Sequence, residues 1–405
     1  MADARPPLFI LVAGEASGDL LGSDLIQGLR QRFPDARFAG IGGPRMREAG
    51  MEIWHPLERL SVMGLVEVLR HLPTLLALRR DVYSRTLRER PDAFIGIDAP
   101  DFNLGLEKRL KRAGVRTVHY VSPSIWAWRE NRAPKMGRSA DRVLCLFPME
   151  PPIYARHQVD ACFVGHPLAR DFALTPDKLA ARRTLSLPES AHVLALLPGS
   201  RLGEIARLGR DFLDASALLR REFPDLHIVI PAANAACERA IRRLVADRER
   251  TVAGGLDPHS DAMDDVTILS PLHSTPPPSH LALIAADAVL LASGTAALEA
   301  MLAKRAMVVA YRIARSTYRI VHILGLLKTT VYSLPNILVG RTLVPELMQD
   351  HCTPPALAGA LAPMLRARAP SAETLDEFIR IHESLRGDPA HGAAAAVAEL
   401  VATAQ

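Results

Sequence analysis

The sequence predicts an α/β protein made of two doubly wound domains, each a parallel sheet with helices on both faces. Apolar, strand-like runs alternate with helix-like segments along the chain, an alternation typical of parallel sheets. The chain has 405 residues, which exceeds the length at which a single core keeps growing. Between His166 and Leu187, prolines surround a short charged helix, a composition that favours a domain boundary.

The strand-like runs form two series, one on each side of this boundary. We expect a first domain at residues 1–170, a second at 171–345, and C-terminal helices at 346–405 that pack back toward the first domain. Open α/β sheets bind ligands beyond the carboxyl ends of their strands, so a cleft between the domains is the expected site of function. The first series comprises residues 8–13, 38–41, 93–97, 116–121, 142–147 and 162–164, and the second comprises 192–197, 226–230, 266–269, 287–291 and 307–311.

The composition is that of a soluble protein with a large core, because 49% of the residues are hydrophobic and 23% are charged. The net charge of +5 favours anionic partners such as nucleotides or phospholipid head groups. The four cysteines form no C-x-x-C pair, so neither a zinc site nor a disulfide framework is predicted. The first apolar run is too short for a signal peptide, and no stretch approaches ~18 uninterrupted apolar residues. We expect a cytoplasmic protein that does not span a membrane.

The first strand runs into the sequence Ala-Gly-Glu-Ala-Ser-Gly-Asp at residues 13–19. Its glycines let the backbone approach a ligand, and Ser17 or Asp19 can cap the following helix. Glu15 is expected to project from the carboxyl end of the strand. The stretch lacks the pattern G-x-G-x-x-G, which argues against a nicotinamide-dependent dehydrogenase.

Two aspartates, Asp98 and Asp101, follow the strand-like run at 93–97. A carboxylate at a strand's carboxyl end is well placed to take a proton from a substrate hydroxyl, so Asp98 is the candidate general base. Asp101 is better explained as a helix cap. No nearby histidine completes a set of metal ligands, and we expect no metal. Farther along, Trp126 and Arg129 either line a pocket for sugar or acyl chains or pack against the core.

Residues 62–82 carry apolar side chains on more than one helical face, and these include Val66, Leu69, Leu72 and Leu76. A helix that is apolar around most of its circumference is normally buried. Arginines are interleaved with this stretch, however, and broad apolar surface beside basic residues also suits the interface of an anionic membrane. The residues alone leave both interpretations open.

Residues 287–299 predict a buried strand that enters a helix through the turn Ser293, Gly294 and Thr295. Free backbone N–H groups at such a helix start favour a phosphate. Glu299 lies about one helical turn farther on, where a carboxylate can accept hydrogen bonds from a ribose. A nucleotide diphosphate site is one interpretation, and an ordinary strand-turn-helix unit with a solvated glutamate is the other.

Three further segments of the second half carry polar or irregular sequence. Gly199 frees the backbone after a strand, Ser200 can cap the next helix, and Arg201 offers a cation beside the expected phosphate position. Asn336 follows a proline and either presents its amide to a base or phosphate or forms a turn. Residues 251–280 are rich in proline and aspartate and predict a surface insertion.

The motifs in chain order are AGEASGD (13–19), IGGPRM (41–46), VMGLVEVL (62–69), GIDAPDFN (96–103), YVSPSIWAWR (120–129), FVGHPL (163–168), LPGSR (197–201), LLASGTAALEAML (290–302) and SLPN (333–336). Together they resemble one family, the lipid-A-disaccharide synthases, which are inverting glycosyltransferases of the GT-B type. The resemblance covers most of the chain and implies two Rossmann-like domains that face a central cleft. The insertion at 251–280 is the departure from the family pattern.

The resemblance implies transfer of 2,3-diacylglucosamine from UDP-2,3-diacylglucosamine to the 6-hydroxyl of 2,3-diacylglucosamine 1-phosphate. The products are lipid A disaccharide 1-phosphate and UDP, within lipid A biosynthesis of a Gram-negative bacterium. No metal or other cofactor is implied. Asp98 is then the base, with Glu15 as a supporting acid or a competitor for that role. Ser17, Trp126 and Arg129 are candidates for an acceptor or acyl pocket.

On the donor side, the resemblance implies that departing UDP is stabilised by the helix start at Gly294 and Thr295, by Arg201 and by Asn336, with Glu299 on the ribose. Because both substrates carry long acyl chains, it also favours peripheral association of residues 62–82 with the inner membrane. The alternatives are another GT-B transferase or a UDP-sugar epimerase, and a nucleotide-binding regulator without catalysis. A nucleic-acid binder is disfavoured because the positive charge is scattered. The oligomeric state, including a homodimer, stays open.

Overall fold

The computed structural model describes residues 5–60, 65–123, 125, 130–253, 265–271, 276–312, 331–387 and 392–402. The chain divides into two compact units. Unit 1 comprises Met1–Pro167 and Ser384–Gln405, and unit 2 comprises Leu168–Glu383. The chain first passes from unit 1 to unit 2 between Pro167 and Leu168, which lies within the stretch 166–187 in which the sequence predicts a domain boundary.

Unit 1 is built on a parallel sheet with the strand order β3-β2-β1-β4-β5-β6-β7. The short edge strand β3 was not predicted, because only its central residues are apolar and it ends in a proline. The strands are β1 (Leu8–Ala13), β2 (Arg37–Gly42), β3 (Glu52–Pro56), β4 (Ala93–Ile97), β5 (Thr117–Tyr120), β6 (Arg142–Cys145) and β7 (Ala161–Phe163).

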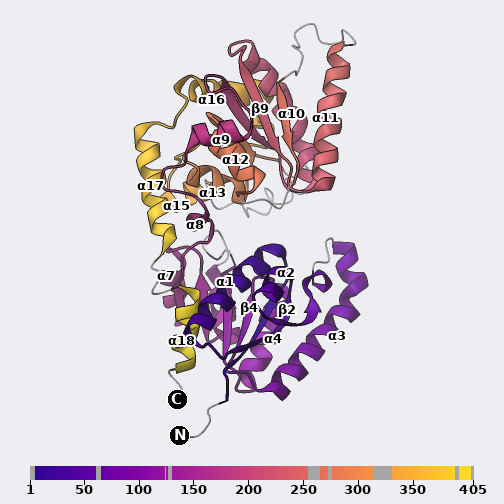
Figure 1. Ribbon diagram of the computed structural model, residues 1–405, viewed down its shortest axis with the longest axis vertical. Coiled ribbons are helices and arrows are strands. Elements are labelled where there is room, and N and C mark those ends of the chain that lie inside the picture. The colour runs from indigo at the N-terminus through magenta and orange to yellow at the C-terminus, as the bar shows by residue number, and fades with distance from the viewer. Residues whose placement is uncertain are drawn as a thin grey trace. The chain divides into compact units, whose positions relative to one another are not determined.

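Helices cover both faces of this sheet, and each face has its own apolar cluster. Helices α1, α2 and α18 contribute to one cluster, in which Leu25 and Val397 pack against strand residues such as Leu11. Helices α3 and α4 contribute Val82 and Leu106 to the other. The helices are α1 (Ala16–Arg32), α2 (Pro44–Glu48), α3 (Leu65–Glu89), α4 (Pro100–Arg112), α6 (Ala133–Ser139), α7 (Glu150–Ala155) and α18 (Ala393–Ala402), and Figure 1 labels most of them.

Unit 2 is built on a second parallel sheet with the order β10-β9-β8-β11-β12-β13. Its edge strand β13 is three residues long and was also not predicted. The order reverses between β8 and β11, so this is a doubly wound sheet with a topological switch point at its centre. The strands are β8 (His192–Leu197), β9 (Leu226–Pro231), β10 (Val266–Leu269), β11 (Ala288–Ala292), β12 (Ala306–Tyr311) and β13 (Glu346–Met348).

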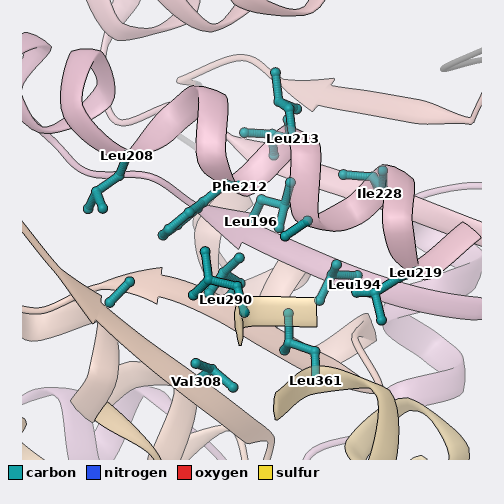
Figure 2. Packing of buried hydrophobic residues seen from close by; sticks show 14 of the residues in the cluster. Leu194, Leu196, Leu208, Phe212, Leu213, Leu219, Ile228, Leu290, Val308 and Leu361 are labelled. Carbon is teal, nitrogen blue, oxygen red and sulfur yellow. The ribbon is translucent and has the colours of Figure 1, made fainter. Parts of the chain in front are cut away.

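An extensive apolar cluster of unit 2 lies between its sheet and the helices α10, α11 and α16. Figure 2 shows Leu194, Leu290 and Val308 of the sheet with Phe212 of α10 and Leu361 of α16. Because side chains alternate along a strand, this face uses every second strand residue. The helices are α8 (Leu168–Asp171), α9 (Lys178–Thr184), α10 (Leu202–Arg220), α11 (Ala235–Ala253), α12 (Pro278–Ala285), α13 (Thr295–Leu302), α15 (Leu334–Val339), α16 (Pro354–Ala367) and α17 (Ala372–Arg386), which crosses into unit 1.

Two expectations about the chain's organisation need correction. The segment 346–405 does not pack as one piece, because α16 belongs to the core of unit 2 and α18 packs on the sheet of unit 1. The segment 251–280 is not a continuous insertion, because α11 extends to Ala253, β10 lies in its middle and α12 begins at Pro278. Within the described residues, no helix is both long and apolar enough to cross a membrane.

Candidate active site

The two acids predicted in the first half of the chain lie at the same edge of the unit 1 sheet. Strands β1 and β4 are neighbours, with Ala13 paired with Ile97, and Glu15 and Asp98 follow their carboxyl ends. Glu15 is exposed and is the N-cap residue of α1, without a side-chain capping bond. The loops that carry the two acids also touch, since a Cβ on Gly14 would lie 2.8 Å from the Cβ of Ala99.

The backbone at Asp98 has an unusual conformation. Asp98 and Ala99 both have positive φ, at 50° and 44°, in the left-handed region that residues with a side chain rarely adopt. Consecutive non-glycine residues in this region require support from surrounding structure, and such strain is common at functional sites. The turn leaves the Asp98 side chain half-buried at the sheet edge.

Helix capping near these acids differs from the prediction. Asp19 does not cap its own helix; its buried carboxylate instead accepts hydrogen bonds from the backbone N–H groups of Gly43 (2.7 Å), Arg45 (3.0 Å) and Met46 (3.1 Å) at the start of α2. Ala99, and not Asp101, is the N-cap residue of α4.

Of the three candidates for an acceptor or acyl pocket, the structure describes only Ser17. Ser17 is exposed in the first turn of α1. Trp126 and Arg129 lie outside the described residues.

A pocket of about 530 Å³ lies in unit 2 at the carboxyl ends of β8, β9 and β11. It is at the topological switch point, where doubly wound sheets bind ligands. The structure brings together here most residues predicted for the donor, which are Gly199, Ser200, Arg201, Ser293, Gly294, Thr295 and Glu299. Sequence reasoning did not find the other lining residues, which include Glu204, Pro231, Ala232, Ala233, Pro271, Pro277, Pro278 and Ser279.

One wall of the pocket is the loop between β8 and α10. Gly199 has φ of 135°, a conformation that favours glycine. Glu204 closes the loop, because its carboxylate accepts from the Ser200 backbone N–H at 3.0 Å and from the Arg201 guanidinium at 3.1 Å. Arg201 is the N-cap residue of α10, and its side chain remains 74% exposed. Its guanidinium is therefore accessible to an anion in the pocket.

The opposite wall is the start of α13. Gly294 is its N-cap residue, and a Cβ there would meet no atom within 4 Å, so the position is open to the pocket. The first N–H groups of a helix have no intrahelical acceptor, and the helix dipole adds partial positive charge at this end. The helix start at the exposed residue Thr295 is thus suited to an anionic oxygen.

Glu299 lies one turn into α13 at the base of the pocket and is half-buried. Burial, together with the nearby carboxylate of Asp171 on α8, raises the pKa of the Glu299 carboxyl to about 7. An acid with this pKa exchanges its proton near neutral pH, so Glu299 can act as an acceptor or as a donor of hydrogen bonds toward a ligand.

In the structure Asn336 adopts the turn-forming role and does not present its amide to the donor pocket. Asn336 is fully buried on α15. Its amide nitrogen donates to the Val344 carbonyl oxygen at 2.9 Å and to the Glu346 carboxylate at 2.6 Å. Its amide oxygen accepts from the backbone N–H groups of Leu343 (2.7 Å) and Val344 (2.8 Å). All four hydrogen-bonding positions of the side chain are occupied, so it serves the turn before β13.

The residues predicted to meet a membrane lie on α3. The side chains of Val66, Leu69 and Leu72 lie outside what the structure describes. Leu76 is 47% exposed and is one of few large apolar side chains exposed among the described residues. Leu78 and Val82, farther along the helix, are buried in the core of unit 1. The described part of α3 therefore has a buried side and an apolar residue on its exposed side.

The full sequence also matches a known family. A family model described as lipid-A-disaccharide synthetase matches residues 9–386. The chain belongs to the lipid-A-disaccharide synthase family. The lipid-A-disaccharide synthase of Xanthomonas oryzae pv. oryzae (strain MAFF 311018) is 53% identical over 400 residues, which cover 99% of this chain and 89% of the relative. That of Xylella fastidiosa (strain M12) is 51% identical over 397 residues, covering 98% and 99%.

Solved structures with low sequence identity share the fold of this chain. A glycotransferase of kitacinnamycin has a TM-score of 0.59 at 17% identity, with 99% of both chains covered. MurG from Acinetobacter baumannii has a TM-score of 0.54 at 14% identity, with 98% of this chain and 99% of MurG covered. The predicted GT-B fold and the predicted class of enzyme, a glycosyltransferase of lipid A biosynthesis, are both confirmed.

Proposed function

We propose that this synthase transfers 2,3-diacylglucosamine from UDP-2,3-diacylglucosamine to the 6-hydroxyl of 2,3-diacylglucosamine 1-phosphate, with inversion at the sugar's anomeric carbon. The observation that carries the donor assignment is the pocket of unit 2, in which an exposed guanidinium, an open helix start and a half-buried carboxyl converge. These groups match a diphosphate followed by a ribose. The 51–53% identity with named synthases supports the choice of acyl sugars.

The donor groups act on the charge that develops as the bond between sugar and diphosphate breaks. That charge collects on the oxygen leaving with UDP, so donors that are already oriented toward it lower the barrier. The α13 start at Gly294 and Thr295 is fixed by the fold before any ligand arrives, as is the backbone of Arg201 at the start of α10. Glu204 supports Arg201 by holding its guanidinium. Glu299 faces the ribose hydroxyls in this arrangement.

Inversion requires a base that takes the proton from the acceptor hydroxyl as the hydroxyl attacks. We assign that role to Asp98, because its turn holds the carboxyl at the carboxyl edge of the unit 1 sheet. Glu15 lies at the same edge and is the competing candidate. The exposed Ser17 remains a candidate for contacts with the acceptor.

We further propose that α3 places the enzyme on the inner membrane from its cytoplasmic side. Both substrates carry acyl chains that reside in a bilayer, so a peripheral enzyme meets them there. Exposed Leu76, with Arg80 and Arg88 exposed farther along the same helix, provides apolar and basic groups for an anionic surface.

The reaction is tested by single-turnover conversion of the two acyl sugars in detergent, with a chelator present. We compare the wild type with Asp98→Asn and with the matched variant Glu15→Gln. We expect product from the wild type, almost none from folded Asp98→Asn, and a smaller loss from Glu15→Gln. Absence of product from the wild type would reject the proposed substrates. Full activity of Asp98→Asn with an inactive Glu15→Gln would transfer the role of base to Glu15.

A further inference from the structure

Asn103 is a fully buried polar residue directly behind the proposed base. It lies in the first turns of α4, and its side-chain amide nitrogen faces the ends of two strands. It donates to the carbonyl oxygen of Asp98 at 2.8 Å and to that of Val12 at 3.3 Å. Val12 belongs to β1, which leads to Glu15. One side chain therefore contacts the main chain of both strands that carry the candidate acids.

The bond to Asp98 completes the support of a strained turn. The Asp98 N–H donates to the Tyr120 carbonyl oxygen at 2.8 Å, which is a main-chain bond to β5. The Asp98 carbonyl oxygen, by contrast, is held by the side chain of Asn103. Since Asp98 and Ala99 both have positive φ, loss of either support lets the turn relax toward commoner conformations. Such a relaxation changes the direction in which the Asp98 carboxyl projects.

We propose that Asn103 is a positioning residue for catalysis, which fixes the left-handed turn and thereby aims the Asp98 carboxyl at the acceptor hydroxyl. This inference rests on the proposed role of Asp98. Asn103 does not reach the substrate itself, because it is fully buried and its amide is directed at the main chain, with its shortest bond to Asp98. What this bond contributes to the rate exists only in a molecule that has the Asp98 carboxylate.

The test is a double-mutant cycle in single-turnover experiments with both substrates in excess of their dissociation constants. Asn103→Ala is made in the wild type and in Asp98→Asn, and folding is checked by thermal melting. We expect Asn103→Ala to lower the rate ~10–100-fold in the wild type and less than about 2-fold in Asp98→Asn, because groups that act as a unit are not additive. The Kd for UDP, bound by unit 2, should change less than about 2-fold.

The control is Leu110→Ala, which removes a fully buried side chain from the same helix. A general loss of stability should lower the rate by the same factor in both backgrounds. If Asn103→Ala does not fold, Asn103→Leu takes its place in the cycle, since leucine fills a similar space without a donor for the Asp98 carbonyl oxygen.

An equal loss in both backgrounds, or full activity of the folded Asn103 variants beside an inactive Asp98→Asn, would overturn the role of Asn103. Full activity of Asp98→Asn would instead overturn the role of Asp98, and the inference with it. The failure of the inference and the failure of the proposed base are therefore distinguishable.

Discussion

The Glu107 carboxylate and the His119 imidazole lie 2.7 Å apart, and both side chains are fully buried. They join α4 to β5. Burial raises the pKa of the Glu107 carboxyl, and the neighbouring His119 opposes that rise. The pair fits only because Gly96 on β4 has no side chain, since a Cβ there would lie 2.1 Å from the Glu107 carboxylate.

Gly96→Ala should therefore destabilise the protein. The added methyl must displace either the buried Glu107–His119 pair or α4, and overpacking of this kind costs about 1–3 kcal/mol of unfolding free energy. Urea denaturation measures the difference. Gly359→Ala on α16 is the control, because a Cβ there meets no atom within 4 Å, and alanine favours a helix. Equal stability of the two variants would contradict the crowding at Gly96.

Asn336→Ala should lower the melting temperature without changing the affinity for UDP. The substitution leaves the N–H groups of Leu343 and Val344 without their acceptor, and each unsatisfied buried group costs about 1–3 kcal/mol. Melting curves and UDP titration at a temperature where the variant is folded separate the two effects. A large loss of UDP affinity in the folded variant would return Asn336 to the donor site.

Arg201→Ala should weaken UDP about 10- to 100-fold, because a charge-assisted hydrogen bond is lost. Calorimetric titration with uridine is the internal control, since uridine lacks the diphosphate and should bind both proteins alike. Arg201→Lys should recover part of the affinity, because lysine keeps the charge but not the planar fork. The exposed position of Arg201 makes an effect on folding small. Parallel losses for UDP and uridine would place Arg201 elsewhere than on the phosphates.

The affinity for UDP should fall as pH rises through the range in which Glu299 titrates. The pKa of Glu299 is raised to about 7, and an arriving diphosphate favours the protonated carboxyl further. Binding therefore takes up a proton, and the Kd should rise roughly 3- to 10-fold between about pH 6 and pH 8.

The matched variant for this pH dependence is Glu299→Gln, which keeps the shape but does not ionise. UDP itself ionises in this range in both proteins, so the difference between the two pH profiles belongs to Glu299. Identical profiles would show that the carboxyl does not sense the nucleotide.

Replacing Leu69, Leu72 and Leu76 together by serine should release the protein from anionic vesicles and leave it folded. Apolar side chains that enter an interface contribute to binding in proportion to their buried area. Flotation with vesicles and a melting curve give the two readouts. Leu78→Ser is the contrasting variant, because Leu78 is buried and its replacement should destabilise the fold. Unchanged flotation would reject these leucines as the membrane contact, and unfolding of the triple variant would assign Leu69 and Leu72 to the core.

The donor pocket could be predicted from the sequence because most of its residues directly follow predicted strands. Gly199, Gly294 and Glu299 each follow the carboxyl end of a strand-like run, and parallel strands bring such ends to one edge of a sheet. The same rule placed Glu15 and Asp98 together. No rule of local sequence reports what lies across that edge, so the proline-rich part of the lining was missed. Glu204 was missed although it is local, since it lies three residues after Arg201.

The sequence-based predictions failed for side chains whose partners are set by tertiary structure, and for two short strands. Asn336 and a ligand-binding asparagine have the same sequence pattern, and only the return of the chain at Glu346 distinguishes them. Asp19 caps α2, which begins at Pro44, 25 residues later in the chain. The strands β3 and β13 are short edge strands, and such strands carry little periodic signal.

Helix α18 has a consequence for how the chain is made. Its Val397 lies in the same core as Leu11, and the Arg116 guanidinium donates to the Val401 carbonyl oxygen at 2.9 Å. During synthesis the N-terminal end of the chain emerges first. The sheet of unit 1 is therefore translated early, but its core is complete only after α18 has been translated. Unit 2, whose residues are contiguous, is complete earlier. The half of the enzyme that is translated first is therefore the half that finishes folding last.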